Sequence, residues 1–209
     1  MNVLIVYAHP NPHSFNAAMR DVAVDALTEA GNSIQVSDLY ALHFKAVLDE
    51  HDFKERQDPD FFNPIVEQYH AATTGTFAED IKREIEKVQW ADLIIFQFPL
   101  WWLSFPAILK GWFDRVFVNG VVVNFATHER LLTGKRVMLA FTTGGSAATY
   151  SAHGPVGDVN VLLAYITRGI FGTVGLDVIP PFIAFGAPSL SSEQRHEVLQ
   201  RYRQRLLAL

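Results

Sequence analysis

The chain has 209 residues, 49% of them hydrophobic and 19% charged, which is enough to bury the core of one domain. Its formal charge of -5 argues against a nucleic-acid ligand, because phosphate recognition normally needs a clustered basic face. The lack of cysteine excludes disulfides, thiolate catalysis and cysteine-bound metal clusters. We therefore expect a cytoplasmic protein without a metal site.

Buried strands alternate with amphipathic helices along the sequence. The predicted strands are 3–8, 34–37, 93–98, 136–142 and 176–185, the last interrupted by Pro180 and Pro181. The predicted helices are 15–31, 79–91, one beginning at Pro106, 158–171, and a closing helix with a capping box at Ser191 and Gln194. This alternation predicts an α/β fold, a doubly wound parallel sheet with helices on both faces.

Two segments interrupt the alternation, at 39–77 and 119–134. Loops this long in a compact domain are usually functional or lie at interfaces, so we expect both to edge a ligand pocket or a dimer contact. The second contains the pattern of a short hairpin. We interpret residues 1–209 as one domain with these two insertions. We expect the first residues to form a strand rather than a signal peptide, and no apolar run reaches the roughly 20 residues that span a bilayer.

The loop after the first strand, 9–16, leads into a helix with Ser14 at the N-cap position. The free N–H groups and the positive dipole end of such a helix suit a phosphate. The loop contains no glycine, so it lacks both the Gly-x-Gly-x-x-Gly dinucleotide fingerprint and the Walker loop. A capped loop without a ligand is the alternative interpretation.

Two further loops end at the same edge of the predicted sheet. The loop 99–105 carries Trp101 and Trp102, which we interpret as a flat apolar wall for a ligand, with core aromatics as the alternative. The loop 142–150 holds a Gly-Gly-Ser turn, a weak signal by itself, whose amides and hydroxyls can approach a planar ligand. Open α/β sheets bind ligands where the strand order reverses. Together the loops suit a flavin, which has a phosphate arm and a flat polar ring.

Long collinear motifs give the chain a resemblance to a known family. They are Ala8-His9, Ser14-Phe-Asn16, Ser37-Asp-Leu-Tyr40, Ala91-Asp-Leu-Ile94, Phe96-Gln-Phe-Pro-Leu100, Pro106-Ala-Ile-Leu-Lys-Gly-Trp-Phe113, Thr142-Thr-Gly-Gly-Ser146 and Gly157-Asp-x-Asn160. With them the chain resembles the NAD(P)H:quinone oxidoreductases of the DT-diaphorase type, which are flavodoxin-like. The resemblance implies a five-stranded sheet of order 2-1-3-4-5 and FAD bound without a covalent bond at a homodimer interface. It also implies ping-pong hydride transfer from NAD(P)H to the flavin and then to a quinone.

Positions that match the family imply the cofactor contacts, with FAD expected rather than FMN. The pyrophosphate arm would lie near His9, Ser14, Phe15 and Asn16. The isoalloxazine would lie against Pro99, Leu100, Trp101, Trp102 and Leu103. Its edge would be hydrogen-bonded by Thr142, Thr143, Gly144, Gly145 and Tyr150, and the adenosine end would lie near Arg195.

The chain departs from the family at residues that bear on catalysis. Val156 stands where a family histidine, with a tyrosine that matches Tyr150, compensates charge during hydride transfer. We assign that role to Tyr150, with His153 as a substitute for the histidine; an exposed loop histidine is the alternative interpretation. Aromatic residues that cap the family's substrate pocket are also replaced, which predicts a more apolar quinone site made by Val123, Asn124 and Phe125.

Three other functions stay open. Relatives of the family include flavin-binding ancillary regulators of potassium-efflux systems, which would co-purify with a membrane transporter. A flavodoxin-like one-electron carrier would form a stable semiquinone. An FMN-dependent azo- or nitroreductase is a close enzymatic neighbour, distinguished by the identity of its flavin.

Overall fold

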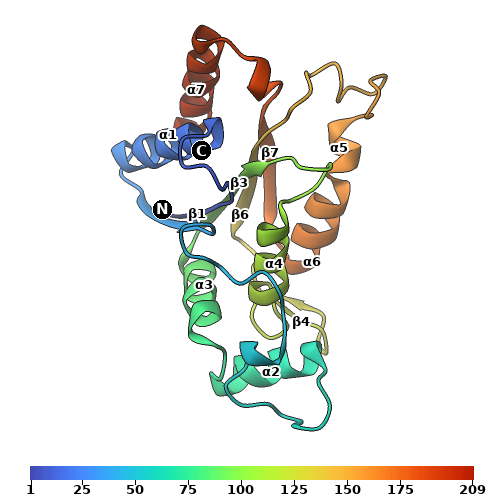
Figure 1. The fold of residues 1–209 in the computed structure, drawn as a ribbon. Helices are drawn as coiled ribbons and strands as arrows, with labels where there is room; N and C mark the ends of the chain where they lie inside the picture. Colours follow the sequence, from blue (N-terminus) through green and yellow to red (C-terminus); the bar gives the residue numbers. More distant parts are fainter.

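The computed structural model describes residues 1–209. Five parallel strands form one sheet in the order β2-β1-β3-β6-β7 (Figure 1). They are β1 (Asn2–Tyr7), β2 (Ser33–Asp38), β3 (Leu93–Pro99), β6 (Arg136–Thr142) and β7 (Asp177–Ala184). The predicted doubly wound sheet and its order 2-1-3-4-5 are confirmed.

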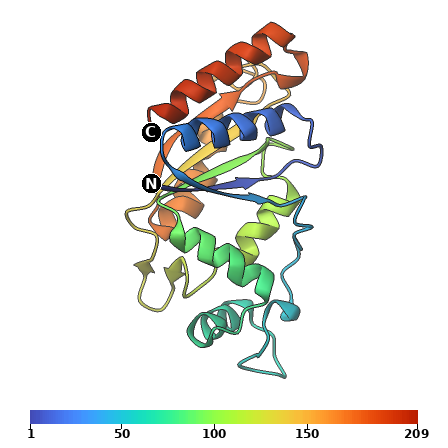
Figure 2. The same cartoon turned by 90° about the vertical axis from the view of Figure 1, so that its left-hand side faces the viewer.

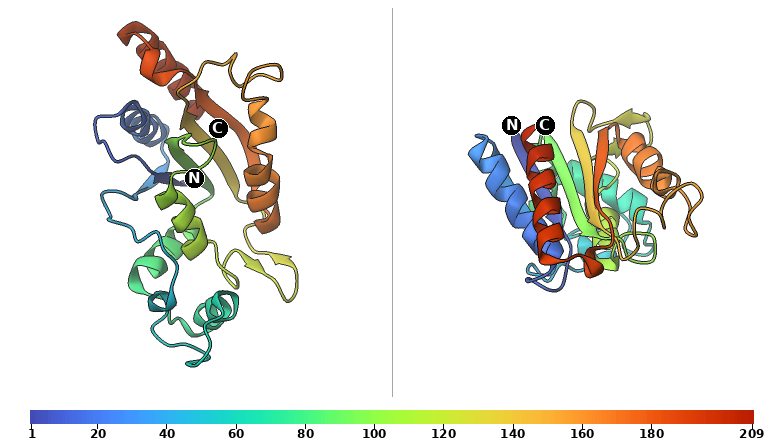
Figure 3. Two further views of the ribbon diagram at one scale, coloured as in Figure 1. Left: turned by 45° about the vertical axis from the view of Figure 1, so that its right-hand side comes forward. Right: turned by 90° about the horizontal axis from the view of Figure 1, so that it is seen from above.

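Helices cover both faces of the sheet, as Figures 2 and 3 show. One face carries α1 (Phe15–Glu29) and α7 (Ser192–Leu207), and the other carries α3 (Glu79–Trp90) and α4 (Ala107–Val116). Successive residues of a strand point to opposite faces. In β3, Leu93 and Ile95 therefore face α1 and α7, and Ile94, Phe96 and Phe98 face α3 and α4.

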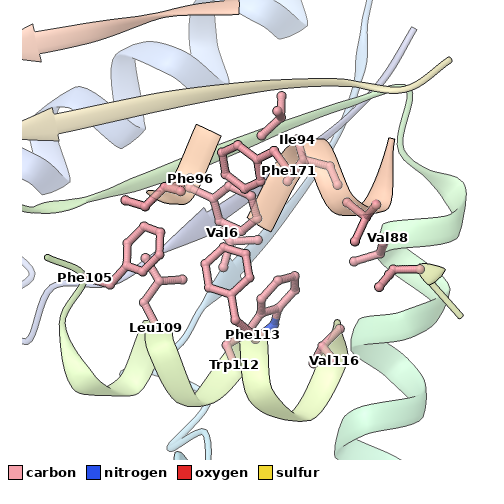
Figure 4. Packing of buried hydrophobic residues seen from close by; sticks show 14 of the residues in the cluster. Val6, Val88, Ile94, Phe96, Phe105, Leu109, Trp112, Phe113, Val116 and Phe171 are labelled. Atoms are coloured by element: carbon pink, nitrogen blue, oxygen red, sulfur yellow. The ribbon is translucent and has the colours of Figure 1, made fainter. Parts of the chain in front are cut away.

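Aromatic rings fill the face under α3 and α4 (Figure 4). Phe96 of β3 is at their centre and is fully buried. Its ring stacks on Phe171 at a centroid distance of 5.6 Å and packs against Phe113 at 4.7 Å and Trp112 at 5.6 Å. Because such rings bury large apolar areas, this cluster is the main hydrophobic anchor of the sheet.

Local sequence explains where the first and last helices begin. The hydroxyl of Ser14 accepts a hydrogen bond of 3.1 Å from the N–H of Ala17 and caps α1 as predicted. Ser191 and Gln194 form the predicted capping box at α7. α4 begins directly after Pro106, whose missing N–H is not needed at that position.

The insertion 39–77 contains secondary structure that the sequence analysis did not predict. A 3₁₀ turn, Glu50–Asp52, is followed by α2 (Pro64–Thr74). The signals for α2 are present in the sequence: Asn63 is its N-cap, proline occupies its first position, and Gly75 ends it in the left-handed conformation.

Arg115 of α4 fastens this insertion to the rest of the fold. Its guanidinium is buried and donates to both carboxylate oxygens of Asp52, at 3.1 and 2.9 Å, and to Asp80 of α3 at 2.7 Å. The backbone of Ala46 also passes so close to Gly111 that a side chain at position 111 would collide with it. The insertion is thus held against α3 and α4 by charge and by close backbone packing.

Of two predictions for the last third of the chain, one is wrong and one is confirmed. Residues 158–171 do not form one regular helix: α5 (Val159–Leu162) is followed by a π-helical segment, Tyr165–Phe171, and then by α6 (Gly172–Val174). Strand β7 runs as one strand through its two prolines, but its pairing with β6 is interrupted at them, as predicted. It lies at the edge of the sheet, where missing N–H groups are tolerated, and the register with β6 shifts between Met138 and Ala140.

The segment 119–134 contains the predicted hairpin, β4 (Val123–Asn124) paired with β5 (Glu129–Arg130). Helix α4 carries the chain from the carboxyl edge of the sheet to its amino edge. The hairpin therefore lies at the end of the molecule opposite to the loops that follow β1, β3 and β6 (Figure 1). None of the helices combines the length and the apolar character that crossing a membrane requires.

Candidate functional site

The loops after β1, β3 and β6 meet at the carboxyl edge of the sheet and line a cavity of about 550 Å³. The strand order reverses between β1 and β3, so the cavity lies where open α/β sheets bind their ligands. It brings together most of the cofactor residues predicted from the sequence. They are His9, Ser14, Phe15, Asn16, Pro99, Leu100, Trp101, Trp102, Thr142, Thr143, Gly144 and Arg195.

The lining also contains residues that the sequence analysis missed: His13, Ala187 and Pro188. His13 lies within the loop 9–16, which the sequence already indicated as a ligand-binding loop. The other two follow β7, and hydrogen bonds bring them to the cavity. The N–H of Ala187 donates to the carbonyl of Thr143 at 3.0 Å, and that of Gly186 donates to Gly145 at 2.8 Å.

The ionisable lining residues suit an anionic ligand. They are Arg195, His9 and His13, without an aspartate or glutamate among them. Burial lowers the pKa of His9, and a hydrogen bond with the backbone of Asn11 offsets this only in part. The amino end of α1 adds the positive end of the helix dipole. The part of the cavity next to these residues and the amino end of α1 can therefore hold phosphate groups.

Asn16 gives the cavity an acceptor that has no protein partner. Its side chain is buried, with 2% of the residue exposed, and its Nδ2 donates to Thr142 Oγ1 at 2.8 Å. Its Oδ1 makes no hydrogen bond, and it is the single buried side-chain polar atom in that condition. An unpaired buried acceptor is costly, so it is best satisfied by a ligand O–H or N–H. The hydroxyl and imide groups of a flavin supply such donors.

A tight turn carries the two tryptophans. Trp101 and Ser104 exchange backbone hydrogen bonds of 3.2 and 3.0 Å, and Trp102 and Leu103 between them both have left-handed backbones. The side chain of Trp102 is 99% exposed, and Trp101 is 41% exposed with its ring 6.0 Å from that of His9. Neither indole belongs to the core, and both line the cavity.

The remaining predicted cofactor residues, Leu103, Gly145 and Tyr150, lie beside the lining rather than in it. Tyr150 is mostly buried, and its ring packs 6.0 Å from that of Phe185. His153 is exposed on the same loop. A catalytic role for Tyr150 or His153 therefore requires the ligand to extend from the cavity toward this loop.

The predicted quinone-binding residues do not reach the cavity of their own chain. Val123 is buried in the hairpin at the amino edge of the sheet, and Phe125 beside it is 47% exposed. The N–H of Phe125 donates to Asn119 Oδ1 at 3.1 Å, which holds the hairpin close to α4. Asn124 caps the hairpin turn through the N–H groups of Ala126 and Thr127, at 3.0 and 3.3 Å. The structure separates these three residues from the other predicted site residues.

Comparison with known proteins gives matches along almost the whole chain. A family described by its flavodoxin-like fold matches residues 1–208. A human protein named ribosyldihydronicotinamide dehydrogenase [quinone] is 41% identical over 98% of this chain and 90% of its own length. A rat protein named NAD(P)H dehydrogenase [quinone] 1 is 40% identical over 97% of this chain and 75% of its own.

A solved structure agrees with these relatives. It carries the name "putative quinone reductase", comes from Klebsiella pneumoniae, is 38% identical, and has a TM-score of 0.94 over 99% of this chain and 83% of its own. The flavodoxin-like fold expected from the sequence motifs is thereby confirmed.

Proposed function

Because the chain belongs to the NAD(P)H:quinone oxidoreductase family of flavodoxin-like proteins, we propose that it is a cytoplasmic, FAD-dependent enzyme that reduces quinones with NAD(P)H. One observation carries the proposal. The cavity combines an exposed indole wall, an orphaned buried acceptor and a basic end without carboxylates. These are the complements of a flat ring, a hydroxylated chain and a phosphate arm.

The distribution of these groups favours FAD over FMN. The ring of His9 lies 6.0 Å from that of Trp101, and Arg195 reaches the cavity from another element, α7. A ligand that extends from the indoles past the amino end of α1 to Arg195 needs a further group beyond the phosphate at which FMN ends. The adenylate of FAD supplies that group.

The chemistry that a bound flavin supplies is two-electron transfer, as a hydride from NAD(P)H and, after the nicotinamide has left, as a hydride to a quinone in the same slot. Trp101 and Trp102 line the cavity and would hold the ring in place for both substrates. Holding donor and acceptor in the correct geometry removes much of the entropic barrier. Tyr150 would donate its hydroxyl proton as a hydrogen bond to charge that develops at the ring edge, and His153 would reach over the ring from the same loop.

We also propose that the enzyme is a homodimer. Phe61, Ile65, Tyr69 and Phe125 expose apolar surface at α2 and the hairpin, and Leu103, Val161 and Tyr165 do so at the carboxyl edge. Patches of this kind favour association. Val123, Asn124 and Phe125 do not line the cavity of their own chain, and in the proposed dimer the second copy would bring them to the quinone. The insertions would then border both the substrate pocket and the dimer contact.

An anaerobic titration tests the proposal. The purified protein, saturated with FAD, is titrated with NADPH and then with a benzoquinone while the flavin absorbance is followed. We expect bleaching by the first and full recovery by the second. From a portion of the purified protein to which no flavin has been added, we expect chromatography of the released flavin to give FAD. Protein that binds neither FAD nor FMN at micromolar concentration would overturn the assignment. A stable semiquinone during reduction would point instead to a one-electron carrier.

The hydride donor has a second candidate. Several relatives that are about as similar to this chain are named ribosyldihydronicotinamide dehydrogenase [quinone]. A parallel titration with ribosyldihydronicotinamide compares the two donors directly. A faster reduction by this donor than by NADPH would identify it as the preferred one.

A further inference from the structure

The turn that carries Trp102 has a backbone that its sequence does not favour. Trp102 and Leu103 have φ angles of 50° and 62°, between the paired residues Trp101 and Ser104. Two successive left-handed residues make a type I′ hairpin turn, which asparagine and glycine favour and bulky side chains rarely adopt. Such a conformation persists only where its surroundings hold it.

One side-chain hydrogen bond reaches this turn from another element. The hydroxyl of Tyr165 lies 2.7 Å from Ser104 Oγ, the usual distance for a hydrogen bond between two hydroxyls. Tyr165 is the first residue of the π-helical segment Tyr165–Phe171, a form of helix that is rare and frequently found at functional sites. The tyrosine is thus anchored in a helix that packs on the core through Ile166 and Phe171.

The turn determines where the exposed indole stands. With 99% of its surface exposed, Trp102 has almost no protein contact that could fix it, so its position follows from the backbone of the turn. A mobile indole would lose conformational freedom on stacking against a ligand, and that loss weakens binding. A bond that restrains the turn in advance reduces this cost.

We propose that Tyr165 is a positioning residue that holds the Trp101–Ser104 turn, and with it the indole of Trp102, in the conformation that receives the flavin. The proposal rests on the proposed function, since the flavin is taken as the ligand of the cavity. Both hydroxyls lie at the surface, so their removal should change the turn locally and leave the fold intact.

Hydrogen exchange in the flavin-free, full-length protein measures the turn directly. The N–H groups of Trp101 and Ser104 close the turn, so their exchange reports its opening. We expect exchange of both amides to become about three- to tenfold faster in Tyr165→Phe, as the loss of one net hydrogen bond implies. Ser104→Ala should act equally, and the double variant should add little, because both remove the same bond.

Two further variants separate positioning from a general loss of structure. Tyr40→Phe also removes one hydroxyl from a tyrosine, but that hydroxyl has no protein partner, and exchange at the turn should not change. Leu103→Gly relieves the strain at one of the two left-handed residues. The turn should then open less often, so exchange at both amides should be slower in Leu103→Gly than in the natural chain, and slower in the double variant with Tyr165→Phe than in Tyr165→Phe alone.

FAD release from the loaded protein, followed by its fluorescence, gives the second readout. Tyr165→Phe should release FAD several-fold faster than the natural chain. Unchanged exchange at residues 101 and 104 would overturn the proposal, and so would faster exchange with unchanged release, since the bond would then not serve the ligand. Failure of the proposed function has a different signature, because the natural chain itself would then bind no flavin.

Discussion

The two faces of the central sheet are built differently. The face under α3 and α4 contains 36 buried residues rich in aromatic rings, whereas the face under α1 and α7 contains 16, mostly small and aliphatic. Each face also buries polar groups. On the larger face they are charged, with Arg115 between Asp52 and Asp80; on the smaller face they are neutral, with Gln97 bonded to Tyr202.

The buried neutral groups form a chain of hydrogen bonds that ends at a residue of the cavity, whereas the buried charged groups bind the insertion 39–77. Tyr202 donates to Gln97 Oε1 at 3.2 Å, and Gln97 donates through Nε2 to the backbone carbonyl of Asn16. Asn16 lines the cavity, and its Oδ1 is buried without a hydrogen-bond partner. The comparison indicates that the face under α3 and α4 stabilises the fold and the insertion 39–77. The face under α1 and α7 supports the residues that would bind the ligand.

The largest expected effect lies on the larger face. Arg115→Met should lower the free energy of unfolding by about 3–5 kcal/mol, because it leaves Asp52 buried without its bidentate partner. Urea unfolding followed by circular dichroism measures this. Lys110→Met is the matched control: it lies on the same helix and removes a partly exposed ion pair with Asp114 worth less than about 1 kcal/mol. Equal losses in the two variants would contradict the role given to the buried network.

A smaller loss is expected on the other face. Burial raises the pKa of Tyr202, so its hydroxyl keeps its proton and acts as the donor to Gln97. Tyr202→Phe leaves Gln97 Oε1 buried and unpaired, which should cost about 1–3 kcal/mol of unfolding free energy. If this face supports the ligand, the folded variant should also bind FAD several-fold more weakly. Lower stability with unchanged FAD affinity would show that the chain of hydrogen bonds ends short of the cavity.

The fold was predictable because its signals are local and repeated. Every strand of the sheet except β2 is mostly an apolar run, and Ser14 and Ser191 mark helix starts by their own chemistry. The π-helical segment Tyr165–Phe171 was not predictable, because it has the same apolar spacing as a regular helix. Helix α2 was missed for a different reason: the polar residues around it resemble a loop, and only Asn63 and Gly75 bound it.

The site residues that could be predicted are those on a loop that directly follows a predicted strand. His9, Asn16, Trp102 and Gly144 were found in this way. Pro188 was missed because it reaches the cavity through pairing of neighbouring strands, which a single sequence does not display. The orphaned Oδ1 of Asn16 and the Ser104–Tyr165 bond were equally invisible, since both depend on atoms brought together only by folding.

The exposed wall should separate binding from stability. Trp102→Ala removes a side chain with almost no protein contacts, so the free energy of unfolding should change by less than about 0.5 kcal/mol. The loss of one aromatic stacking partner, worth about 0.5–1.5 kcal/mol, should raise the FAD dissociation constant by roughly two- to tenfold. Titration of the flavin-free protein with FAD measures the second effect. Full affinity in the variant would mean that Trp102 does not contact the flavin.

The smallest expected effect is a dependence of FAD affinity on pH. Burial holds the pKa of His9 below its ordinary value, so the ring is neutral at neutral pH in the free protein. A bound phosphate favours the protonated ring and raises this pKa, so binding takes up a proton and FAD affinity should increase as the pH falls from about 8 to 6. Stability of the free protein should change in the opposite direction. The unfolded chain binds the proton more readily than the folded one, so stability is lost as the pH falls through the ordinary histidine range. His9→Asn should reduce both slopes, and an unchanged FAD titration slope would remove His9 from the phosphate site.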